Sequence, residues 1–354
     1  MAQQIPKRHH VIPKLLLRNF TEDPGDKRSL LWRLDLASGK IHQAGRDNVA
    51  VIKHYYSVEG PSGERDPAPE VALSQIEGHV GPIIQGIVEP GGRLRRKDRF
   101  ALGAFIALLY RRTPRGRSYL NFIDRQVSNL LFDLSVSDTH HFHQDMAELN
   151  PDRSPEEIET LRAQMRGRIN RGEQIFSSTP DRELGMMFWR LESMAGDLAG
   201  GFEWTILRAA AQSQFVLSDA GLAIVDADPG QVDRGLSFAS SPTVETTLPL
   251  SPTTCLVLWP KTPSGLHLPP GSLRRIACVE RPATDQEVQS INLRSLAWSG
   301  QAVYASGAAA LSPLKGLAKR NAALVKSYRP RGPKIWVGEE RDGQAEWTGY
   351  APDD

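Results

Sequence analysis

The stretch Phe202–Arg208, FEWTILR, begins the part of the chain that decides the fold. It follows the pair Gly200-Gly201 and is rich in β-branched and aromatic residues, which favour strands. Four similar short runs follow it, at Phe215–Ser218, Leu222–Val225, Thr254–Trp259 and Arg275–Val279. Because clusters of Pro, Gly and Ser separate these runs, the pattern predicts an antiparallel sheet.

The residues before Gly200 have mostly helical patterns. Apolar periodicity and helix-start signals predict helices at Pro69–Val88, Arg96–Arg112, Tyr119–Val136, from Ser154 to about Arg171, and from Thr179 to Gly200. A hairpin of Leu30–Asp35 with Lys40–Gln43 precedes them. After the strands we expect a helix from Thr284 to Trp298, a strand at Val303–Ala305, a closing helix at Leu314–Val325 and a hairpin turning at Asp342-Gly343.

This segregation of helices from strands predicts an α+β fold. A helical layer from the N-terminal half would pack on an antiparallel sheet from the C-terminal half. We expect a single domain over residues 1–354. A division into two lobes, residues 1–200 and 201–350, is equally compatible with the pattern.

Composition restricts the classes of function. The 354 residues carry a formal net charge of +2, so only local clusters of charge could select an anionic partner. The longest apolar run, Phe100–Tyr110, is far shorter than the roughly 20 residues that span a bilayer. Two cysteines exclude a disulfide scaffold at this length. We therefore expect a cytoplasmic protein without a membrane partner.

Several common catalytic motifs are missing from the sequence. It has no Walker A loop, no G-x-G-x-x-G after a strand, no G-x-S-x-G and no H-E-x-x-H. The usual nucleotide-binding, serine-hydrolase and zinc-protease mechanisms are therefore not indicated.

Two groups near the N-terminus have residue types that suit catalysis. His10 lies before a stretch stiffened by Pro13, which would hold its imidazole in a defined direction as a base or a metal ligand. Glu70 and Glu77 are seven residues apart on one predicted helix, about 10 Å along its axis. They could share a metal ion, or be two carboxylates on a solvated helix face.

A basic cluster occupies residues 93–117, with nine Lys or Arg against the single Asp98. Arg112 is followed by Thr113-Pro114, where the helix must end. Arginines here offer paired donors to phosphate, although cations in a last helical turn are also favoured by the helix dipole.

Two weaker candidates lie further on. His140, His141 and His143 stand beside Asp138 and Asp145, at offsets that can ligate Zn²⁺ or Ni²⁺. Exposed histidines at a helix end are the alternative. Ser218-Asp219 ends a predicted strand, where polar pairs often line a cleft.

Taken in order, these pieces resemble the family known as domain of unknown function 4238. The resemblance rests on His10-Val11-Ile12-Pro13, Leu17-Arg18-Asn19-Phe20, Tyr56-Ser57, Glu70, Glu77, Arg112-Thr113-Pro114, Ser218-Asp219, Pro249-Leu250-Ser251-Pro252 and Asn292. The family pattern has Thr before Ser-Asp and Pro two residues after it, where this chain has Leu217 and Gly221. The family carries no established activity, so the resemblance bears on architecture more than on chemistry.

The sequence therefore leads to one mechanistic hypothesis and its rivals. Glu70, Glu77 and Asp219 would hold a divalent ion such as Mg²⁺ or Mn²⁺, with His10 as base and Arg112 neutralising phosphate, in hydrolysis of a phosphoester that could belong to a nucleic acid. The alternatives are a non-catalytic binding or regulatory protein, in which these residues hold the fold together, and a defence or toxin effector.

Overall fold

The computed structural model describes residues 8–57, 66–173, 179–210, 212–226, 238, 244–260, 278–318, 338–341 and 344–347. Helices dominate the N-terminal half and mainly antiparallel sheets dominate the C-terminal half, so the α+β prediction is confirmed. In these ranges no helix has the length and apolar character needed to cross a membrane.

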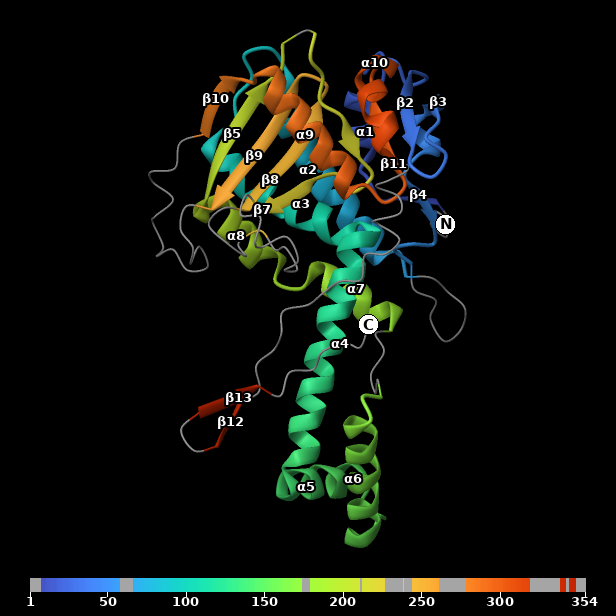
Figure 1. Cartoon of the computed structure of the whole chain (residues 1–354), viewed down its shortest axis with the longest axis vertical. Coiled ribbons are helices and arrows are strands. Elements are labelled where there is room, and N and C mark those ends of the chain that lie inside the picture. Colours follow the sequence, from blue (N-terminus) through green and yellow to red (C-terminus); the bar gives the residue numbers. More distant parts are fainter. Residues whose placement is uncertain are drawn as a thin grey trace. The chain divides into compact units, whose positions relative to one another are not determined.

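Most strands lie in two sheets (Figure 1). The five-stranded sheet has the order β10 (Cys278–Pro282), β5 (Phe202–Arg208), β9 (Thr254–Pro260), β8 (Val244–Ser251), β7 (Ala223–Asp226). The four-stranded sheet has the order β3 (Ile41–Gly45), β2 (Leu30–Asp35), β11 (Ala302–Ala305), β6 (Leu217–Ser218). Two further pairs join β1 (Arg8–His10) to β4 (Val51–Lys53), and β12 (Gly338–Arg341) to β13 (Gln344–Trp347).

Helices cover both faces of the larger sheet. Alternate side chains of a strand point to opposite sides, so each strand contributes residues to both faces. Leu207 of β5 and Val257 of β9 pack with Val288 and Ile291 of α9 (Asp285–Trp298), which crosses in front of the sheet in Figure 1. On the other face, the indole of Trp204 donates to the Leu198 carbonyl of α8 (Leu191–Gly201) at 2.9 Å. Strand β10 pairs with β5 in parallel, unlike its neighbours.

Most of the other helices were predicted from the sequence, but α5 and α10 in the following set were not. The set comprises α1 (Lys14–Asn19), α2 (Ala68–Val88), α3 (Arg99–Arg112) after a 3₁₀ turn at Arg96–Asp98, α4 (Pro114–Ser137), α5 (Thr139–Leu149), α6 (Pro155–Asn170), α7 (Pro180–Phe188) and α10 (Ala308–Leu311). Both expected capping boxes are present, at Ser154 with Glu157 and at Thr284 with Glu287. Of the predicted closing helix, residues 319–325 lie outside the described part of the chain.

Several local predictions were wrong. Strand β6, which was predicted to lie in the same sheet as Phe202–Arg208, pairs with β11 in the four-stranded sheet. The helix expected from Thr179 to Gly200 is two helices, because Arg190 has a left-handed backbone (φ 52°) that ends one and begins the next. Strand β8 was not predicted, because Pro249 within a run argues against a strand. The pairing of β8 with β9 shifts register between Pro249 and Ser251, and this irregularity accommodates the proline.

The chain divides into two compact units. Unit 1 comprises residues 1–117 and 187–354, and contains both large sheets. Unit 2 comprises residues 118–186, and Val136, Phe142, Ile158 and Ile169 form its buried core. The site described below lies entirely in unit 1.

Candidate functional site

Arg112, at the end of α3, is the centre of a buried polar network. It is only 4% exposed, and its guanidinium has three acceptors. It forms an ion pair with Glu77 of α2, donates to the Tyr56 hydroxyl at 3.0 Å and donates to the His10 carbonyl at 2.7 Å. The structure thus places the His10 backbone, Glu77 and Arg112 side by side, with Arg112 bonded to both of the others.

The aromatic ring of Tyr56 fills the middle of this network. It is 1% exposed and stacks on His9, whose Nδ1 accepts from the Tyr56 amide at 2.7 Å. Burial raises the pKa of Tyr56; Arg112 opposes the rise, and Glu70 and Glu77 add to it, which also places Glu70 nearby. One carboxylate oxygen of Glu70 is buried without a hydrogen bond in the described structure.

The imidazole of His10 is neutral at neutral pH. Burial, helped by Lys14, lowers its pKa to about 4. Its Nε2 lies 3.3 Å from the Arg46 carbonyl, which fixes that nitrogen as the donor. His10 therefore contributes a backbone carbonyl to Arg112 and an oriented ring to the β1–β4 region, with no cationic charge.

Asp219 lies in a separate hydrogen-bonded cluster. Its two carboxylate oxygens accept from three consecutive amides, Gly300 at 2.8 Å, Gln301 at 2.6 Å and Ala302 at 3.1 Å. Burial raises the pKa of Asp219, and these three amides oppose the rise. The carboxylate thereby fixes the turn between α9 and β11.

Asn19 and Asn292, two further residues of the family pattern, also hold distant main chain. Asn292 accepts from the Val216 amide at 2.9 Å and donates to the Gln214 carbonyl at 2.8 Å. Asn19 donates to the Leu250 carbonyl at 2.9 Å. Each of these side chains joins segments far apart in sequence, which is the arrangement expected of residues that hold a fold together.

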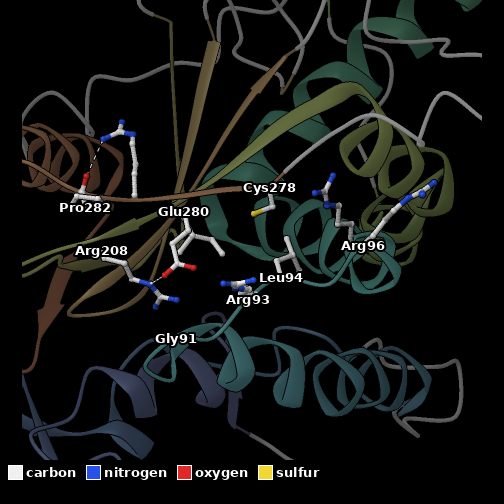
Figure 2. A pocket seen from close by; sticks show the side chains of 11 residues that line it. Gly91, Arg93, Leu94, Arg96, Arg208, Cys278, Glu280 and Pro282 are labelled. Atoms are coloured by element: carbon white, nitrogen blue, oxygen red, sulfur yellow. Dashed lines mark hydrogen bonds and ion pairs between the residues drawn. The ribbon is translucent and has the colours of Figure 1, made fainter.

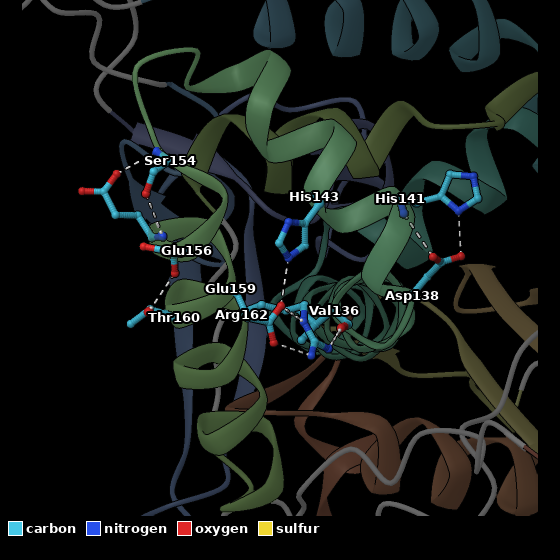
Figure 3. Close-up of polar contacts among 10 residues, drawn as sticks. Val136, Asp138, His141, His143, Ser154, Glu156, Glu159, Thr160 and Arg162 are labelled. Atoms are coloured by element: carbon cyan, nitrogen blue, oxygen red, sulfur yellow. Dashed lines mark hydrogen bonds and ion pairs between the residues drawn. The ribbon is translucent and has the colours of Figure 1, made fainter.

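Metal-binding geometry is missing from the described ranges, where no three His, Cys, Asp or Glu come together in a way that could hold an ion. The histidine-rich start of α5 has other partners (Figure 3). Asp138 caps the helix and contacts the His141 ring at 2.7 Å, while His143 contacts Glu159 of α6 at 2.8 Å.

The two ends of the basic cluster lie in different surroundings. At the C-terminal end of α3, Arg112 is in the network above. Arg117 donates to the Tyr55 carbonyl at 2.8 Å, and the Arg115 guanidinium lies 4.1 Å from the centre of the Trp298 ring. At the N-terminal end, Arg93 and Arg96 are exposed. This second end faces an open space.

That space is a cavity of about 790 Å³ at the edge of the five-stranded sheet (Figure 2). Its walls come from the segment between α2 and α3, from β5 and from the edge strand β10. The lining residues are Gly91, Arg93, Leu94, Arg96, Arg99, Ile206, Arg208, Cys278, Glu280, Arg281 and Pro282. They include five arginines and a single carboxylate. We call this cavity the arginine pocket.

Arg208 fixes the shape of the arginine pocket. Its guanidinium pairs with Glu280 of β10 at 2.9 Å, and donates to Thr254 Oγ1 and to the Gly92 carbonyl, each at 2.8 Å. It thereby ties the sheet to the loop that carries Arg93. Glu280 is thus paired with Arg208, and Arg281, another arginine of the lining, forms an ion pair with Glu287 of α9 at 2.6 Å.

Arg99 gives the pocket its strongest electrostatic feature. It is only 5% exposed, and burial lowers its pKa; Cys278 opposes this shift and Arg96 adds to it. Arg99 lies beside Arg96 in the wall of the pocket, so two guanidinium groups stand close together there. The lining of the pocket is therefore rich in positive charge.

Arg208, Glu280 and Cys278 were not predicted from the sequence as residues of a functional site. Alternation along FEWTILR puts Ile206 and Arg208 on one face of β5, and this was readable from the sequence. The pairing of β5 with β10 brings Cys278 and Glu280 beside Ile206 and Arg208. This pairing could not be predicted from the sequence.

Fold and site together define an α+β protein with a preformed, cationic pocket at a sheet edge. The chain belongs to the family described as protein of unknown function (DUF4238), whose model matches residues 8–308. This confirms the resemblance predicted from the sequence. No curated protein and no solved structure matches the chain.

Proposed function

We propose that this protein binds a phosphate-bearing ligand in the arginine pocket. The observation that carries the proposal is the presence of Arg93, Arg96 and Arg99 together in the wall of one cavity. A volume of about 790 Å³ is within the usual range for small-molecule sites.

Phosphate suits this pocket better than a single carboxylate does. Guanidinium groups offer planar, paired donors that match phosphate oxygens, and several arginines can share one polyphosphate. Leu94, Ile206 and Pro282 add apolar surface between the charges, which lowers the local dielectric and strengthens each contact.

The test is a calorimetric titration of inorganic tripolyphosphate into the wild type and into an Arg93→Ser/Arg96→Ser double variant. Each charge-assisted hydrogen bond contributes about 1.5–3 kcal/mol, so we expect the double variant to bind roughly 100-fold more weakly. Binding to the wild type should also weaken as salt is raised.

The matched control is Arg28→Ser/Arg153→Ser, which removes two exposed arginines outside the pocket. It should bind as the wild type does. The proposal fails if the wild type does not bind tripolyphosphate, or if the control loses as much affinity as the pocket variant.

Metal-assisted phosphoester hydrolysis remains a prediction for His10, Glu70, Glu77 and Arg112. The geometry favours it less than binding, because Arg112 already engages Glu77, and Asp219 already has three amide donors. Titration of Mg²⁺ and Mn²⁺ tests it. On this structure we expect the same heats for the wild type and Glu77→Ala; saturable binding that disappears in the variant would restore the hydrolase hypothesis.

A further inference from the structure

A second, smaller cavity adjoins the arginine pocket. Its volume is about 280 Å³, and Arg96, Lys97, Arg99, Phe100, Gly196 and Ala199 line it. Arg96 and Arg99 line both cavities, so the two spaces meet at these guanidinium groups. We call the smaller one the Phe100 slot.

The Phe100 slot has an aromatic wall and a wall of small residues. Phe100, near the start of α3, is 50% exposed, which is unusual for so large an apolar side chain on a mostly buried helix. The opposite contributors, Gly196 and Ala199, lie on α8, and a side chain added at Gly196 would meet no atom within 4 Å. The slot therefore has free space beside an accessible aromatic ring.

The two cavities differ in chemistry. The larger has five arginines in its lining, and the smaller has an exposed aromatic ring with Arg96, Lys97 and Arg99 beside it. A flat aromatic group gains energy by stacking on such a ring, and Arg96 and Lys97 can contact its edges.

We propose that the ligand is a free nucleotide, with its phosphates in the arginine pocket and its base in the Phe100 slot. This inference rests on the proposed function. A nucleoside di- or triphosphate has the same layout as the paired cavities, a polyanion joined to one planar ring system. The slot accepts one base, which favours a mononucleotide over a nucleic-acid strand, whose successive bases need successive stacking surfaces.

The experiment compares ATP with inorganic tripolyphosphate by calorimetry on the full chain. In the wild type we expect ATP to bind at least about tenfold more tightly, since stacking of one base on an aromatic side chain contributes that much or more. Phe100→Ala removes the ring, and Gly196→Leu fills the slot. Both variants should lose the preference for ATP and bind tripolyphosphate as the wild type does.

Two matched variants control for indirect effects. Leu293→Ala removes an exposed apolar side chain of α9, and Gly185→Leu places the same new side chain in open space on α7. Both should keep the preference for ATP. Circular dichroism spectra and thermal melts confirm that each variant folds.

The outcomes separate the two proposals. Equal affinity of the wild type for ATP and tripolyphosphate would overturn the nucleotide inference and leave the phosphate pocket standing. No binding of either would overturn both. Binding of a single-stranded oligonucleotide that excess ATP does not displace would also overturn the nucleotide inference, in favour of nucleic acid.

Discussion

Replacing Arg112 by Met should lower the free energy of unfolding by about 3–5 kcal/mol, the usual cost of breaking a buried ion pair from one side. The substitution keeps much of the side-chain volume but removes every donor. Glu77, the Tyr56 hydroxyl and the His10 carbonyl would then lose their shared partner. The β1 segment would lose its link to α2 and α3.

Urea denaturation followed by tryptophan fluorescence measures this loss. All seven tryptophans of the chain lie outside residues 118–186, so their emission reports on unit 1. Lys14→Met is the control, because the Lys14–Asp47 pair is more than half exposed on both sides and should contribute less than about 1 kcal/mol. An Arg112→Met loss as small as that of the control would mean that Arg112 does not hold the fold, and would return it to consideration as a phosphate-binding group.

Replacing Gly221 by Pro should lower the free energy of unfolding of unit 1 by about 3–6 kcal/mol, from backbone strain, overpacking and a lost hydrogen bond. Gly221 has φ +76°, which the proline ring cannot adopt. A Cβ there would lie 2.9 Å from side-chain atoms of the buried Leu109, and the Gly221 amide donates to the Ser218 carbonyl at 2.9 Å. Glycine therefore suits this position, because its backbone is left-handed and Leu109 leaves little room for a side chain.

Two alanine variants separate these contributions. Gly91 has a similar φ of +73° but open space around it, so Gly91→Ala measures backbone strain alone, about 1 kcal/mol. Gly221→Ala adds the contact with Leu109 and should cost more. A Gly221→Pro protein as stable as the wild type would show that this segment can adopt a different backbone, and would contradict this account.

Local signals allowed much of the fold to be predicted. The capping boxes at Ser154 and Thr284, and the hairpin of β2 and β3, depend on residues a few positions apart, and all were found. The predictions of helix and strand bounds failed where a residue adopts a backbone conformation that is unusual for its residue type. Arg190 is not a residue expected in a left-handed conformation, and Pro249 is not expected within a paired strand.

The candidate site was only partly readable for a different reason. The basic cluster was recognised in the sequence. The sequence did not show that one end of this cluster faces a cavity, or that the other end forms contacts within the protein. That division depends on contacts such as Arg115 with Trp298. The opposite wall of the arginine pocket comes from the parallel pairing of β5 with β10, and nothing local in either strand specifies that pairing.

The most direct test of the central claim is the alkylation rate of Cys278 with and without tripolyphosphate. Of the two cysteines, Cys255 is fully buried, whereas Cys278 is partly exposed and lines the arginine pocket. Burial raises the pKa of the Cys278 thiol, so the reaction is best followed at mildly alkaline pH. If the phosphate ligand occupies the arginine pocket, saturating tripolyphosphate will slow modification of Cys278 severalfold; an unchanged rate under conditions where the anion is bound would place it elsewhere and contradict the account.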